Sequence, residues 1–154
     1  MGRGIRAAAI LLVGILLGAF RDFLFINLNY QIDHVQRATV GSFAHSRFQA
    51  WVTDWGLSDL VRLKWVLAGG FILCMWGLSL ALLRNANTMA RLARPVSLIF
   101  GGVALAALLM HGLARWLPLE EASVNLLHAI QYPVLLIVIQ VALVLLSDTR
   151  ADGP

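Results

Sequence analysis

Ionisable side chains interrupt the apolar parts of this sequence at a few places, and these side chains could do chemistry. The candidate site residues are Arg21, Asp22, His111, Arg115 and His128. The forked donors of an Arg suit a phosphate-bearing headgroup, and a His beside it could act as a general base. Charges inside an apolar segment are costly unless they are paired. These residues therefore predict either an open site for an anionic headgroup or a closed structural network.

Histidines could also bind a cofactor in two places. His111 and His128, counted along helices from the turn between them, lie at similar depth, as the two axial ligands of a haem would. His34 and His45, with Asp33, could hold a metal outside a membrane, but they lack the fixed ligand spacing of a metal site. Because no second histidine pair supports a haem and no spacing supports a metal, we predict no cofactor and no metal.

The composition excludes several classes of protein. Of the 154 residues, 60% are hydrophobic and 13% are charged, whereas soluble domains have about 45–50% and about 25%. The single cysteine, Cys74, excludes an internal disulfide and a Cys-x-x-Cys thiol oxidase. The sequence contains no nucleotide-binding, serine-hydrolase or zinc-protease motif. The net charge of +4 comes from basic residues that lie mainly beside the apolar segments, so we predict orientation signals and no nucleic-acid binding.

Four apolar segments, each about 20 residues long, predict four membrane-spanning helices. The predicted spans are about 7–28, 65–83, 96–117 and 124–146, with an outer loop at 29–64 and a cytoplasmic turn at 84–95. The first span is expected to remain uncleaved, because no good small-residue cleavage site follows it. The predicted fold class is an all-α integral membrane protein: a four-helix transmembrane bundle that forms a single membrane domain, residues 1–154.

Three residues are expected to mark the ends or bends of these helices. Ser58 is a good N-cap for the helix of the second span. Pro95 suits the start of the third helix, where its missing N–H costs nothing. Pro133 is expected to kink the fourth helix in its first half.

Basic residues orient the predicted bundle. With four spans, both termini and the 84–95 turn lie on the same side of the membrane. That side carries six arginines: Arg3, Arg6, Arg84, Arg91, Arg94 and Arg150. The positive-inside rule therefore places both termini in the cytoplasm, with the chain in a bacterial inner membrane. The five candidate site residues would then converge at the outer mouth of the bundle.

The outer loop predicts a short interfacial helix between spans one and two. Phe48, Trp51, Val52 and Trp55 follow i, i+3, i+4, i+7 spacing and would share one helical face, with the tryptophans at headgroup depth. A helix that caps the bundle without touching lipid fits the same spacing.

Polar residues at helical spacing predict that the first helix continues beyond the membrane. Asp22, Asn29, Asp33 and Gln36 fall on one face. This stripe could face the outer loop, or it could be a solvated helix end.

Small residues predict close packing between helices. Gly14 and Gly18 form a G-x-x-x-G pair on the first span, and Gly69, Gly70 and Gly77 lie on the second. We expect the first pair to pack against a helix of the same chain.

The sequence favours a non-catalytic accessory or assembly subunit of a bacterial envelope complex. Its partners would be membrane lipids, and a protein or a second copy bound through Gly14/Gly18 and the Trp51/Trp55 loop. Two other functions stay open: an outer-leaflet enzyme or lipid-binding protein that uses the Arg, Asp and His cluster, and a small transporter or haem-binding membrane protein.

Overall fold

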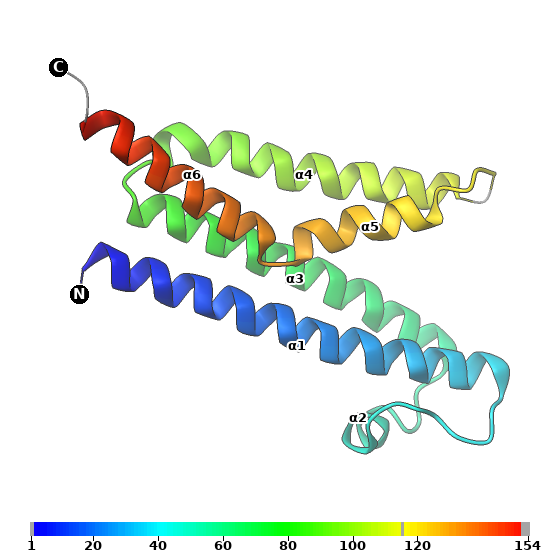
Figure 1. The fold of residues 1–154 in the computed structure, drawn as a ribbon. Helices are drawn as coiled ribbons and strands as arrows, with labels where there is room; N and C mark the ends of the chain where they lie inside the picture. Colours follow the sequence, from blue (N-terminus) through cyan, green and yellow to red (C-terminus); the bar gives the residue numbers. More distant parts are fainter. Residues whose placement is uncertain (1, 115, 152–154) are drawn as a thin grey trace. The chain divides into compact units, whose positions relative to one another are not determined.

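All regular secondary structure in the described part of the chain is helical (Figure 1). The computed structural model describes residues 2–114 and 116–151, with the side chains of these residues except 120 and 146–151. The helices are α1 (Arg3–Arg37), α2 (Ser46–Trp51), α3 (Leu57–Asn85), α4 (Met89–Leu113), α5 (Glu120–Gln131) and α6 (Val134–Ala151). The all-α prediction is therefore confirmed for the described residues.

Among the described residues, three helices are long and apolar enough to cross a membrane, namely α1, α3 and α4. The pair formed by α5 and α6 passes the same test as one bent unit, which allows up to 4 spans. Only 28%, 33% and 17% of the apolar windows of α1, α3 and α4 are buried inside the protein. Their remaining large apolar side chains, such as Leu16, Val66 and Leu109, are exposed. Surfaces of this kind suit helices that have hydrocarbon as their solvent.

The fourth predicted span is two helices rather than one kinked helix. Tyr132, between α5 and α6, has an extended backbone (φ −93°, ψ 156°), as residues before proline prefer. Pro133 has no N–H to continue the hydrogen-bond ladder. The axes of the two helices differ by 52°, so the predicted kink is a complete break.

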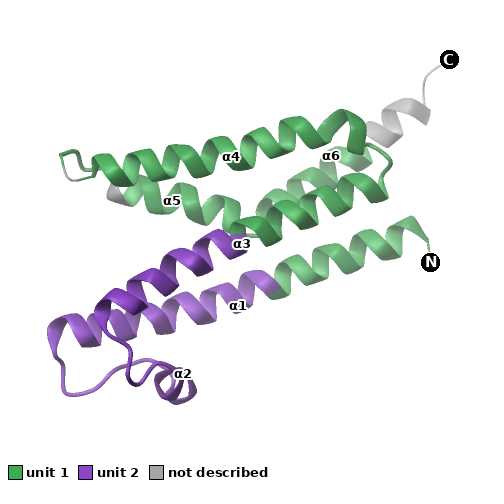
Figure 2. Ribbon diagram, turned by 180° about the vertical axis from the view of Figure 1, so that it is seen from behind, with its two compact units in different colours: residues 1–16, 72–154 green, residues 17–71 purple. Residues whose placement is uncertain are grey.

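Two compact units divide the chain, as coloured in Figure 2. Unit 1 contains residues 1–16 and 72–154, and unit 2 contains residues 17–71. In unit 1, the Trp76 indole donates to Ser97 Oγ at 2.9 Å and joins α3 to α4. The Ser123 hydroxyl donates to the Ala107 carbonyl at 2.9 Å and joins α5 to α4.

Gly14 is a position of close helix approach in unit 1. A Cβ built on Gly14 would lie 2.5 Å from Cδ1 of Leu136 on α6, and 3.7 Å from Cδ1 of Leu78 on α3. The small residue therefore lets α1 pack against helices of the same chain, as its spacing predicted. Gly69, Gly70 and Gly77 behave differently, since a Cβ on each would meet no described atom within 4 Å.

Unit 2 has its own apolar core. It consists of Leu24, Phe25, Leu28, Ala44, Phe48, Val52, Leu60, Ala68 and Phe71. These residues come from α1, α3, α2 and the loop that contains α2. The outer loop is thus folded onto helices through buried side chains.

Several predicted helix boundaries are wrong. Helix α3 begins at Leu57, so Ser58 lies in its first turn rather than at its N-cap. Helix α4 begins at Met89, after a turn in which Asn87 has φ 56°, so Pro95 lies inside the helix. Helix α4 also ends at Leu113, before the predicted end of the third span at 117.

Candidate functional site

Arg21 and Asp22, the first two candidate site residues, contact each other on α1. Nη1 of Arg21 lies 2.9 Å from Oδ1 of Asp22. The Arg21 side chain is only 3% exposed, whereas that of Asp22 is 42% exposed. Adjacent residues do not face each other on a helix, so the long Arg side chain must bend to reach its neighbour. The ion pair therefore joins a buried guanidinium to a partly exposed carboxylate.

The ring of Phe25 covers the Arg21 guanidinium. Its Cζ lies 4.6 Å from the centre of the Phe25 ring, one turn further along α1. The Phe25 ring lies 6.2 Å from that of Phe71 on α3, and the Phe20 ring lies 6.4 Å from Phe71. A guanidinium on a ring face gains cation–π attraction, which is larger where water is excluded. Arg21 thus contacts a carboxylate and the ring of Phe25, which itself belongs to a cluster of rings.

A second polar cluster, centred on Asn27, joins α1 to the outer loop. The Asn27 side chain is 6% exposed. Its amide donates to the Phe23 carbonyl at 2.7 Å, and its amide oxygen accepts from the backbone N–H of His45. The His45 ring lies 5.9 Å from that of Phe23, and its Nδ1 accepts from the N–H of Arg47 at the start of α2. The sequence pattern missed Asn27, although an amide in an apolar run is a signal of a buried hydrogen bond.

The predicted polar stripe on α1 is a solvated helix end. Asn29 and Gln36 are exposed, and Asp33 pairs with Arg37 at 2.6 Å while about half of its carboxylate side chain is exposed. The polar groups buried on α1 instead include Gln31, whose amide oxygen has no hydrogen-bond partner within the described residues.

The four apolar residues of the outer loop do not share one helical face. Helix α2 ends at Trp51, and Val52 follows it with φ −121° and ψ 20°, which lies outside the helical region. Phe48 and Val52 are buried, whereas Trp51 is 71% exposed and Trp55 is 40% exposed. The predicted short helix is present. Phe48 and Val52 belong to the apolar core, whereas Trp51 and Trp55 do not.

His111 and His128 are not at the same level of the α4–α5 hairpin. The bond from Ser123 to the Ala107 carbonyl sets the register of the two helices. His128 follows Ser123 by five residues and His111 follows Ala107 by four, and the antiparallel helices carry them in opposite directions. At about 1.5 Å per residue, the offset along the axis is on the order of 10 Å. The similar depth expected for haem ligation is therefore wrong, and the His128 ring instead lies 6.1 Å from that of Tyr132.

The candidate residues fall into different parts of the molecule. Arg21 and Asp22 belong to unit 2, and His111 and His128 belong to unit 1. Arg115 lies outside the described residues. The expected convergence of all five at one outer mouth stays a prediction. The other two histidines have local roles, since His34 Nδ1 lies 2.8 Å from Thr39 Oγ1 in a hydrogen bond and His45 caps α2.

A comparison of the chain with protein-family models, with curated proteins and with solved structures found no match.

Proposed function

We propose that this chain is a non-catalytic, four-span protein of a bacterial cell membrane, with both termini in the cytoplasm, and that it acts as an accessory or assembly subunit. One observation carries the non-catalytic part: Arg21 is buried, paired with Asp22 and covered by Phe25. A catalytic Arg must reach its substrate, whereas this guanidinium is 3% exposed. The arrangement supports a structural role for the cluster, in preference to an outer-leaflet enzyme.

The outer loop supplies the surface for a partner. Some large apolar side chains of this loop are exposed, although Phe48 and Val52 of the same loop are buried. Phe43 is 85% exposed and Trp51 is 71% exposed. Gly14 is a poorer contact for a partner, because Leu136 of the same chain already covers it. Aromatic residues are more frequent in protein interfaces than on the rest of the protein surface, and exposed apolar patches often mark such interfaces.

The proposed topology predicts opposite labelling of two engineered cysteines. Cys74 is first replaced by serine, and then Thr53→Cys or Met89→Cys is introduced, because both positions are exposed. In intact cells, a membrane-impermeant maleimide should label Thr53→Cys and leave Met89→Cys unlabelled until the membrane is opened. Labelling of both positions from one face would contradict the four-span arrangement.

The assembly role predicts a stable complex in mild detergent. Protein purified through a C-terminal tag should carry a partner in fixed ratio, and Trp51→Ala should reduce the retained partner at least about tenfold, since exposed aromatics are frequent hot spots. Trp116→Ala is the matched control, because Trp116 is 79% exposed and lies in a different connection. A protein that always elutes as a lone monomer, or equal losses from both variants, would argue against this role.

A further inference from the structure

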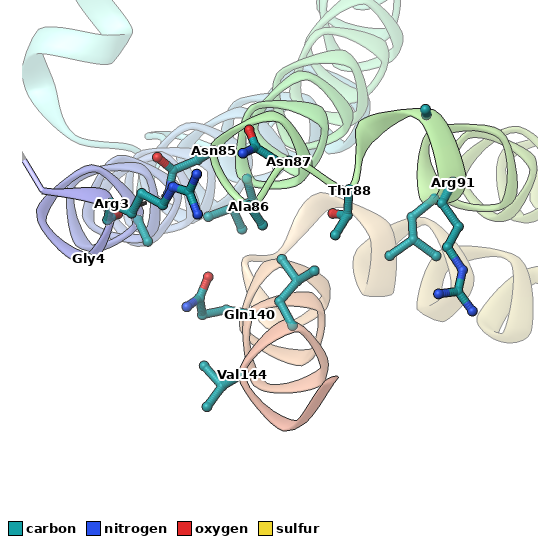
Figure 3. Close-up of a pocket in the computed structure, with 14 residues that line it drawn as sticks. Arg3, Gly4, Asn85, Ala86, Asn87, Thr88, Arg91, Gln140 and Val144 are labelled. Carbon is teal, nitrogen blue, oxygen red and sulfur yellow. Dashed lines mark hydrogen bonds between the residues drawn. The ribbon is translucent and has the colours of Figure 1, made fainter. Parts of the chain in front are cut away.

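Unit 1 contains a large open cavity that neither the candidate site nor the proposed partner surface uses. Its volume is about 800 Å³, within the usual range for ligand pockets. The start of α1, the turn between α3 and α4, and the second half of α6 line it. Figure 3 shows the labelled side chains around this space, with Arg3 on one side and Arg91 on the other. These segments are the ones that the predicted topology places at the cytoplasmic surface of the membrane.

The charge of the cavity is positive. Arg3 and Arg91 line it, and none of the described residues that line it is acidic. Both side chains are exposed, and neither has an ion-pair partner within the part of the chain that the structure describes. Each of the two guanidinium groups can bind an anionic oxygen through forked hydrogen bonds.

Uncharged polar groups also line the cavity, and some of them form hydrogen bonds that fix its lining segments. The Asn85 amide donates to the Arg3 carbonyl at 2.9 Å and ties the start of α1 to the end of α3. The Thr88 hydroxyl donates to the Leu83 carbonyl at 3.3 Å in the turn before α4. Asn87 and Gln140 add amide donors, and Figure 3 shows Gln140 extending from α6 toward the side on which Arg3 lies.

The rest of the wall is apolar. Ala7 of α1, Leu92 of α4, and Leu143 and Val144 of α6 line the cavity. A free inorganic anion would leave this surface unused. An amphiphile with an anionic head and a hydrocarbon chain would cover both parts of the wall.

We propose that the cavity binds a phosphate-bearing amphiphile, its headgroup held by Arg3 and Arg91 and its hydrocarbon chain lying along Leu143. In a membrane protein of the proposed topology, the matching ligand is an anionic phospholipid of the cytoplasmic leaflet, where such lipids meet basic residues. The inference rests on that membrane placement, and it does not require a protein partner.

The test uses the full-length protein in a non-ionic detergent, with bound ligand counted by native mass spectrometry. The probes are phosphatidylglycerol, phosphatidylcholine, glycerol phosphate and inorganic phosphate. We expect phosphatidylglycerol to bind at least about tenfold more tightly than phosphatidylcholine, since that ratio corresponds to one good charge-assisted contact. The double variant Arg3→Gln/Arg91→Gln should lose this preference.

The matched control removes the same charge from the same two helices. Arg6→Gln/Arg94→Gln changes two exposed arginines that do not line the cavity, and it should keep the preference for phosphatidylglycerol. Equal loss in both double variants would show a general surface-charge effect and overturn the proposal. Absence of any preference in the native protein would overturn it as well.

A second variant guards against misfolding and separates the two sources of phosphate. Leu143→Trp fills the apolar part of the cavity and keeps both arginines, so phosphatidylglycerol binding should fall at least about tenfold, as for a blocked apolar pocket. If inorganic phosphate and glycerol phosphate bind as tightly as the lipid and Leu143→Trp changes nothing, the ligand is a soluble phosphate compound and the amphiphile is excluded. These binding measurements use the isolated protein, so their result does not depend on whether a partner co-purifies.

Discussion

Replacing Arg21 by alanine is expected to lower the free energy of unfolding of the detergent-solubilised protein by about 3 kcal/mol. The variant removes a buried side chain from between Asp22 and Phe25, where the native guanidinium lies 2.9 Å from the carboxylate and 4.6 Å from the ring centre. It leaves a cavity beside the Phe25 ring and an Asp22 carboxylate without this partner. Denaturant or heat titration, followed by circular dichroism, measures the loss.

Two further variants separate packing from charge. Arg21→Met keeps most of the volume and the contact with Phe25, so it should cost less than Arg21→Ala. Asp22→Asn should cost about 2 kcal/mol, because it leaves the 3% exposed Arg21 guanidinium without this carboxylate, and a buried charge that loses its partner is costly. If all three variants unfold like the native protein, Arg21 is no structural group and the non-catalytic proposal loses its main support.

The long helices were predictable from the sequence because the length of an apolar segment is enough to identify them. An apolar run of about 20 residues can only be a spanning or deeply buried helix, and α1, α3 and α4 each contain one. The disruption at Pro133 was also predictable, since proline removes a backbone hydrogen bond from a helix interior, although the structure has a complete break there in place of the predicted kink. Helix ends were less predictable, because Pro95 by residue type favours a first turn and yet lies in the interior of α4.

The partners of individual polar groups could not be predicted, because a shift of one residue turns a helical side chain by about 100°. Asn29 was assigned to a polar face and is exposed, whereas Asn27, two residues earlier, is buried against His45. The depth of His111 and His128 failed for a related reason. The depth of each histidine depends on where α4 ends, where α5 begins, and which residues of the two helices lie opposite each other. The spacing of residues in the sequence does not determine that register.

The positive cavity in unit 1 was hidden in the sequence for a different reason. Arg3 and Arg91 were read as orientation signals, and they are 88 positions apart in the chain. Only the fold brings the start of α1 beside the α3–α4 turn, through the bond from Asn85 to the Arg3 carbonyl. The same arginines can serve both roles, since a basic residue that orients a helix also lies at the depth of lipid headgroups.

Replacing Gly14 by leucine is expected to lower the free energy of unfolding by about 3 kcal/mol, the upper end of the usual cost of overpacking. A Cβ alone would lie 2.5 Å from Cδ1 of Leu136, and Leu136 is 1% exposed, so it has little room to move away. Gly14→Ala should cost about 1 kcal/mol, because the better helix propensity of alanine offsets part of the clash.

Gly77 provides the matched control within the same unit. It lies on α3, it is exposed, and a Cβ there would meet no described atom within 4 Å. Gly77→Ala should therefore leave the free energy of unfolding unchanged or raise it by up to about 1 kcal/mol. A double variant, Gly14→Ala with Leu136→Ala, should recover stability lost through the clash, which a double-mutant cycle measures as a coupling of about 1 kcal/mol. Additive effects in that cycle would mean that Gly14 does not pack against α6, and the G-x-x-x-G pair would again be open to a second chain.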